Sequence, residues 1–151
     1  MAKRNANTRQ SPGTSSALKT RFLGHNDNTP TDTLEALPLT RVGACADLIT
    51  LQCSEFTSLC PVTGAADFGT LEITYSPCAH VVETKSLKLY LSSYRTVRAF
   101  NEVLVERIAA DFYAQIRPQY VKVRGTFHPR GGISVIAEQT LPLIPAEHPY
   151  K

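Results

Sequence analysis

A long amphipathic helix that ends at a proline is the feature that most constrains this sequence. Between residues 100 and 116 the apolar side chains recur at the three- and four-residue spacing of one helix face, at Phe100, Val103, Leu104, Ile108, Phe112 and Ile116. Pro118 lacks the backbone N–H that a helix interior needs, so we predict that the helix ends before it. A helix with one apolar face must bury that face against another element.

Strand patterns flank this helix on both sides. Leu71, Ile73 and Tyr75 alternate with polar residues, which is typical of a sheet with one solvated face. A mostly apolar run near Ile49 predicts a buried strand, and a turn follows it around Cys60. We predict strands over four segments of the chain, namely 47–53, 69–76, 121–124 and 133–137.

A shorter helix is predicted before the long one, with Thr84 as its candidate N-cap and with apolar positions at Leu87, Tyr90, Leu91 and Tyr94. The resulting order is strand, strand, helix, helix, strand, strand. Such a unit places both helices on one face of a small antiparallel sheet, which is an α+β fold. Because only scattered charges protect the two sheet edges, we expect copies of the chain to assemble.

Charge divides the chain into two parts. Residues 1–26 contain five basic residues and no acidic one, whereas the rest is slightly acidic. We expect residues 1–32 to form a flexible basic tail and residues 33–151 to form a single domain, since 151 residues with 42% hydrophobic content suit one core. A slightly acidic domain argues against sequence-reading DNA binding, and we expect no nucleic-acid partner.

Several other protein classes lack support in the sequence. No run reaches the roughly 18 apolar residues of a membrane span, and no signal peptide precedes the domain, so we expect a cytoplasmic protein without a membrane partner. The four cysteines have irregular spacings and are interpreted as free thiols. Neither the histidines nor the cysteines show metal-ligand spacing, and no glycine-rich nucleotide-binding loop is present.

Two residues could carry chemistry at the first loop. Cys60 lies in a Pro/Gly-containing turn, and Asp67 follows seven positions later, just before a strand. A thiol there can be a nucleophile if its surroundings favour the thiolate, and the carboxylate can move protons for it. A single cysteine is more often a small buried apolar side chain, and an aspartate before a strand is more often a turn residue. Both interpretations stay open on these residues alone.

The helix starts carry charges that also allow two interpretations. Lys85 and Lys88 lie where the helix dipole disfavours cations, so they are either solvated or bind an anionic ligand. Glu102 lies near the start of the long helix, where a carboxylate is favoured for capping alone.

Three segments in a consistent order resemble a known family. They read EFTSLCPVTGAAD at residues 55–67, ETKSLKLYLSSYR at residues 83–95 and FHPRGGIS at residues 127–134. Together they are similar to the QueF family, the NADPH-dependent 7-cyano-7-deazaguanine reductases of the single-module type, and the resemblance covers about residues 35–137. It implies the tunnelling fold, in which two strands, two helices and two further strands form one unit. Such units assemble into rings with active sites between subunits.

The resemblance also implies a reaction and roles for individual residues. It makes Cys60 the nucleophile that adds to the nitrile carbon and forms a covalent thioimide, and it makes Asp67 the general acid and base. The product would be 7-aminomethyl-7-deazaguanine, which feeds queuosine synthesis for tRNA, with NADPH as cofactor and no metal. Contacts to the small-molecule substrate, 7-cyano-7-deazaguanine, fall on Val82, Glu83, Thr84, Asn101 and Glu102, where Glu102 holds the guanine-like edge. The implied partners of the NADPH phosphates are Lys85, Lys88 and Arg130.

One departure keeps alternatives open. Position 101 is commonly histidine in the family, and Asn101 can form hydrogen bonds but cannot titrate. The first alternative is a QueF-like amidinotransferase of archaeosine formation, in which ammonia adds to the same thioimide. Those relatives lack the ETKSLK segment, so its presence favours the reductase. The second is a non-catalytic pterin- or purine-binding protein in which Cys60 is structural.

Overall fold

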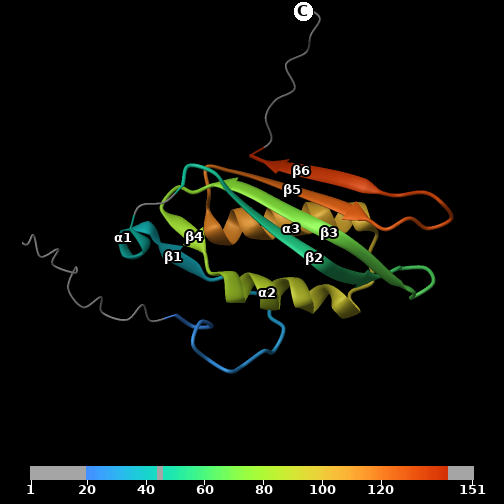
Figure 1. The fold of residues 1–151 in the computed structure, drawn as a ribbon, viewed down its shortest axis with the longest axis horizontal. Coiled ribbons are helices and arrows are strands. Elements are labelled where there is room, and N and C mark those ends of the chain that lie inside the picture. The colour runs from blue at the N-terminus through green and yellow to red at the C-terminus, as the bar shows by residue number, and fades with distance from the viewer. Residues whose placement is uncertain (1–19, 44–45, 143–151) are drawn as a thin grey trace, which may run out of the picture.

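The chain is described here by a computed structural model that covers residues 20–43 and 46–142. A four-stranded antiparallel sheet has two helices on one face (Figure 1). Its strands lie in the order β2 (Ile49–Leu59), β3 (Ala66–Ser76), β5 (Tyr120–Phe127) and β6 (Ile136–Leu141). The predicted element order and the α+β class are therefore confirmed.

The helices follow one another between β3 and β5. They are α2 (Thr84–Ser93), the short 3-10 turn η1 (Tyr94–Thr96) and α3 (Asn101–Ile116). A separate two-stranded sheet pairs β1 (Ala36–Pro38) with β4 (His80–Val82), and α1 (Leu39–Val42) follows β1. This second sheet and α1 were not predicted, because three- and four-residue elements are too short to show a period.

The core lies between α3 and the inner face of the sheet. Leu104, Ile108, Phe112 and Ile116 are fully buried along α3, and the ring of Phe112 meets that of Tyr75 with centroids 5.0 Å apart. The alternation predicted for β3 is confirmed, since its odd-numbered residues are buried. Phe100 and Val103 differ from the prediction. They are 59% and 42% exposed, because the buried stripe of α3 passes through positions 101, 104, 105 and 108 instead.

Several boundaries differ from the sequence-based expectation: β3 begins at Ala66 rather than at residue 69, and β5 covers Tyr120–Phe127 rather than 121–124. The first strand continues to Leu59 instead of ending at Cys53, and the last strand begins at Ile136 rather than Ile133. Thr84 does not cap α2, because the Glu83 side chain accepts hydrogen bonds from the backbone N–H groups of Lys85 and Ser86. A carboxylate at this position satisfies two helix-end donors and suits the helix dipole.

The predicted tail is only partly described. Residues 1–19 lie outside the described residues, whereas residues 20–32 contact the domain. The backbone N–H of Arg21 donates to Glu35 Oε1 at 2.7 Å, and the N–H of Thr31 donates to the Leu89 carbonyl at 3.4 Å. Across residues 20–43 and 46–142, no helix is long and apolar enough to cross a bilayer.

Candidate active site

A β-bulge in β2 sets the orientation of the predicted nucleophile. Cys53 pairs with Leu71, but the next aligned pair is Phe56 with Gly69, so β2 contains one extra residue at this point. Side chains of a strand alternate between faces, and an extra residue therefore switches which positions face the helices. After the bulge the buried residues of β2 are Phe56 and Ser58. Cys60, two residues after Ser58, is buried as well and continues this alternation.

The turn after β2 holds Cys60 by its backbone. The N–H of Cys60 donates to the Ala65 carbonyl at 2.8 Å, and the N–H of Gly64 donates to the Cys60 carbonyl at 2.9 Å. Gly64 has a φ of +73°, and a Cβ at this position would lie 2.8 Å from a guanidinium nitrogen of Arg98. The positive φ favours glycine here, since the guanidinium of Arg98 is the end of a flexible side chain that can move.

The surroundings of Cys60 favour its ionised form. Hydrogen bonds from the Thr63 hydroxyl and N–H, from the Arg130 side chain and from the Val62 N–H lower the pKa of the Cys60 thiol to about 6. A cysteine with a lowered pKa is mostly thiolate at neutral pH, and the thiolate is the nucleophile. This environment favours the interpretation of Cys60 as a nucleophile over that of a buried apolar side chain.

Asp67 lies on the same face of the sheet as Cys60. It is the register partner of Ser58 across β2 and β3, and its side chain is only 4% exposed. Arg130 Nη2 lies 2.7 Å from Asp67 Oδ2. Arg130 reaches this position from a tight turn after β5, in which its N–H and carbonyl both pair with Ile133. Its guanidinium therefore connects the carboxylate with the thiol.

The start of α3 lies beside the same turn. Leu59 forms backbone hydrogen bonds with Val97 at 2.9 Å and with Ala99 at 3.2 Å, so this segment runs alongside the end of β2. Asn101 follows as the first residue of α3 and is buried, while Glu102 is exposed. The structure therefore brings Cys60, Asp67, Arg130 and the Asn101–Glu102 pair to one end of the sheet.

The other predicted substrate residues lie at the opposite end of the domain within one chain. Val82 and Glu83 precede α2, whose ten residues span about 15 Å, and α2 runs toward the Cys60 end (Figure 1). Glu83 is buried, and both of its carboxylate oxygens accept backbone N–H groups at 2.7 Å. Thr84 is exposed. A single chain does not bring these three residues to Cys60.

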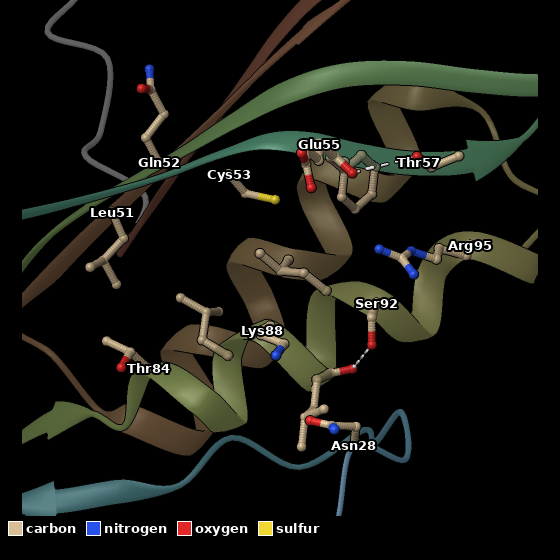
Figure 2. A pocket seen from close by; sticks show the side chains of 14 residues that line it. Asn28, Leu51, Gln52, Cys53, Glu55, Thr57, Thr84, Lys88, Ser92 and Arg95 are labelled. Carbon is tan, nitrogen blue, oxygen red and sulfur yellow. Dashed lines mark hydrogen bonds between the residues drawn. The ribbon is translucent and has the colours of Figure 1, made fainter. Parts of the chain in front are cut away.

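A cavity of about 540 Å³ lies between β2 and α2. Figure 2 shows Lys88 and Arg95 extending into it from the helical side, opposite Cys53 and Glu55 on β2, with Thr84 near one end. With two cations against the one carboxylate of Glu55, the lining is net positive and partly apolar, which suits an anionic ligand with an apolar part. Lys85 does not line this cavity, because its ammonium contacts the backbone carbonyl of His25.

Ser58 and Thr63 are two site residues that the sequence analysis did not identify. Counting back two positions from Cys60 along an extended strand would have found Ser58, but the strand was predicted to end at Cys53. Thr63 lies in the turn, where a hydroxyl three residues after a cysteine can donate to the sulfur. In the part of the chain that the structure describes, no three His, Cys, Asp or Glu side chains gather closely enough to hold a metal ion.

The pKa of Cys60 can be tested by alkylation. We expect the rate of its reaction with iodoacetamide to rise through pH 6 and to level off above about pH 7, because only the thiolate reacts. In Thr63→Val and Arg130→Met variants the midpoint should move up toward the ordinary thiol value. Mass spectrometry of the peptide that contains Cys60 separates this thiol from the others. A midpoint that stays near 6 in both variants would contradict the assigned cause.

Comparisons with known proteins cover half of the chain or more. The model of the QueF-like protein family matches residues 66–141. The NADPH-dependent 7-cyano-7-deazaguanine reductase of Porphyromonas gingivalis is 51% identical over 88 residues, which are 58% of this chain and 57% of that protein. The protein of the same name from Helicobacter pylori strain G27 is 47% identical over 104 residues, or 69% of this chain and 70% of that one.

The fold also matches a solved structure. The crystal structure of the archaeosine synthase QueF-Like in the apo form superposes with a TM-score of 0.63 and 24% identity, covering 68% of this chain and all of that one. At this identity the likeness concerns the fold. The chain spans a little over half the length of the Porphyromonas relative.

Proposed function

Since the chain belongs to the QueF-like protein family, we propose that it is an NADPH-dependent reductase that converts the nitrile of 7-cyano-7-deazaguanine to the aminomethyl group. The observation that carries the proposal is the thiol of Cys60, with a pKa of about 6, beside the buried Asp67 carboxylate. Relatives about 50% identical bear the name of this activity. The cytoplasm, which keeps thiols reduced, suits such a nucleophile.

The first step in this proposal is covalent. The Cys60 thiolate adds to the nitrile carbon, so a C–S bond forms while one C–N π bond breaks. The nitrogen takes a proton from Asp67, which acts in its acid form after taking that proton from solvent, and the product is a thioimide on Cys60. Arg130 stabilises the thiolate before the attack through its contact with the sulfur. We therefore assign Arg130 to the nucleophile and the acid, rather than to the cofactor phosphates.

NADPH, when bound, supplies two hydrides, of which the first releases the imine from Cys60 and the second yields the amine. Asp67 passes a proton to the nitrogen in each half of the reaction, so the whole conversion consumes two protons. Lys88 and Arg95 fit the phosphates, because both extend into the cavity between β2 and α2. The glycine-rich loops that usually hold nucleotides are not needed for a site built from these cations.

Two copies of the chain would complete the substrate site. Cys60 and Val82–Thr84 lie at opposite ends of one domain, and a ring of subunits can place the two ends together. Exposed Phe100 and Val103 flank Glu102 beside the Cys60 turn, which supports an apolar contact between subunits there. Glu102 would then hold the guanine-like edge through both carboxylate oxygens inside the contact.

Mixing two inactive variants tests the shared site. Cys60→Ala and Glu83→Gln should each be inactive alone, whereas rings co-assembled from equal amounts should regain activity at about a quarter of the sites, since each such site combines two intact halves. Steady-state reduction of the nitrile measures the recovery. Activity no higher than that of the separate variants would contradict a site built from two chains.

The proposed function has a direct test. Incubation with 7-cyano-7-deazaguanine and NADPH should oxidise two NADPH for each aminomethyl product, followed by absorbance of the cofactor and by mass of the product. Formation of an amidine from ammonia, with no NADPH oxidised, would identify the amidinotransferase instead. Binding of the nitrile without a covalent adduct would identify a non-catalytic purine-binding protein.

A further inference from the structure

Two buried polar atoms have no hydrogen-bond partner within the described residues, and both belong to the Cys60 end of the sheet. They are Ser58 Oγ and Asn101 Oδ1. Ser58 is fully buried, and Asn101 is 7% exposed. Burial of a polar atom without a partner costs free energy, so native proteins leave few such atoms. An unpaired atom beside a reacting centre has a natural explanation in a ligand that supplies the missing partner.

Ser86 shows that a buried serine in this chain is otherwise fully bonded. It is as buried as Ser58, yet its hydroxyl donates to the Glu83 carbonyl at 2.6 Å and accepts from the Glu35 N–H at 2.9 Å. The two serines therefore differ in their partners and not in their burial. Ser58 is the one that lies opposite Asp67 and two residues before Cys60, on the same face of the sheet.

The proposed reaction creates donors at this place. A nitrile nitrogen carries no hydrogen, whereas the nitrogen of the thioimide and of the imine carries one and that of the amine carries two. An amide oxygen such as Asn101 Oδ1 only accepts hydrogen bonds, and the hydroxyl oxygen of a serine can accept one as well. Both atoms are thus matched better by the later nitrogen species than by the starting one. Interactions that strengthen along the reaction accelerate it.

Resting on the proposed function, we propose that Ser58, together with Asn101, holds the reacting nitrogen from the thioimide to the amine and retains the imine between the two hydride transfers. Neither residue carries charge, so neither competes with Asp67 for the role of acid. Ser58 near the end of β2 and Asn101 at the start of α3 belong to segments joined by the backbone hydrogen bonds of Leu59, which supports a shared contact with one ligand atom.

Ser58→Ala tests this role, with Ser86→Ala as the matched control for folding. Ser58→Ala should have an unchanged or higher Tm, because it removes an unpaired buried hydroxyl, whereas Ser86→Ala should have a lower Tm. In Ser58→Ala we expect kcat to fall about tenfold or more with little change in KM for the nitrile. Imine that escapes is hydrolysed by water to an aldehyde and ammonia, so more than two NADPH should be consumed for each amine.

A binding measurement gives a readout that does not depend on turnover. In a Cys60→Ala background, Ser58→Ala should weaken affinity for the aminomethyl product by about tenfold and leave affinity for the nitrile nearly unchanged. Asn101→Ala should act in the same direction, as an independent second variant. Wild-type kcat, product ratio and amine affinity in Ser58→Ala would overturn the inference while leaving the proposed function intact. A wild-type protein that neither binds nor reduces the nitrile would overturn both.

Discussion

Cys60→Ala abolishes both the covalent adduct and turnover, because alanine leaves no atom that can bond the nitrile carbon. Intact-mass spectrometry of the protein with the nitrile alone should show the adduct in the wild type and none in the variant. Cys78→Ala is the matched control, since Cys78 is an exposed thiol outside the site. Residual NADPH oxidation in Cys60→Ala at a rate near that of the wild type would refute the covalent mechanism.

Asp67→Asn permits substrate binding and slows the reaction by about 10² or more, because asparagine keeps the size of the side chain but supplies no proton. The adduct should form slowly, and kcat should fall while KM for the nitrile changes little. Alkylation of Cys60 at pH 8 separates a lost acid from a lost thiolate, since it should proceed at the wild-type rate.

Glu72→Gln provides the matched control for Asp67→Asn. Glu72 lies on β3, as Asp67 does, but its position in the alternation places it on the other face of the sheet. It pairs in register with Arg124 of β5. The same chemical change there should leave kcat within about twofold, as expected for a surface site. A fall in kcat of similar size in both variants would remove Asp67 from its assigned role.

The parts of the fold with a sustained period could be predicted from the sequence. The long helix before Pro118 and the alternation of Leu71, Ile73 and Tyr75 are confirmed because each repeats its period several times. The strand at Ile49 was predicted too short. Its alternation fails at the bulge, where Ser54 and Glu55 are both exposed, and a period-based method has no signal across such a break.

The site residues also differ in how far the sequence could identify them: roles that depend on a local segment could be predicted, and contacts that depend on the tertiary fold could not. Cys60 and Asp67 could be proposed from their segment, and the structure places them on one face. The partners of Arg130 could not, because its contact with Asp67 depends on a turn 63 residues away in sequence. The capping role of Glu83 was also missed, since threonine is preferred over glutamate at an N-cap on propensity alone and Thr84 is the adjacent residue.

The bulge in β2 has a consequence for how this segment can vary. Which way Cys60 points is determined by the number of residues between Cys53 and Phe56, rather than by their side chains. Exchanging Ser54 or Glu55 for other exposed residues preserves that number, but losing either one would turn Ser58 and the sulfur toward solvent. Related chains should therefore tolerate substitutions at these two positions and resist gaps.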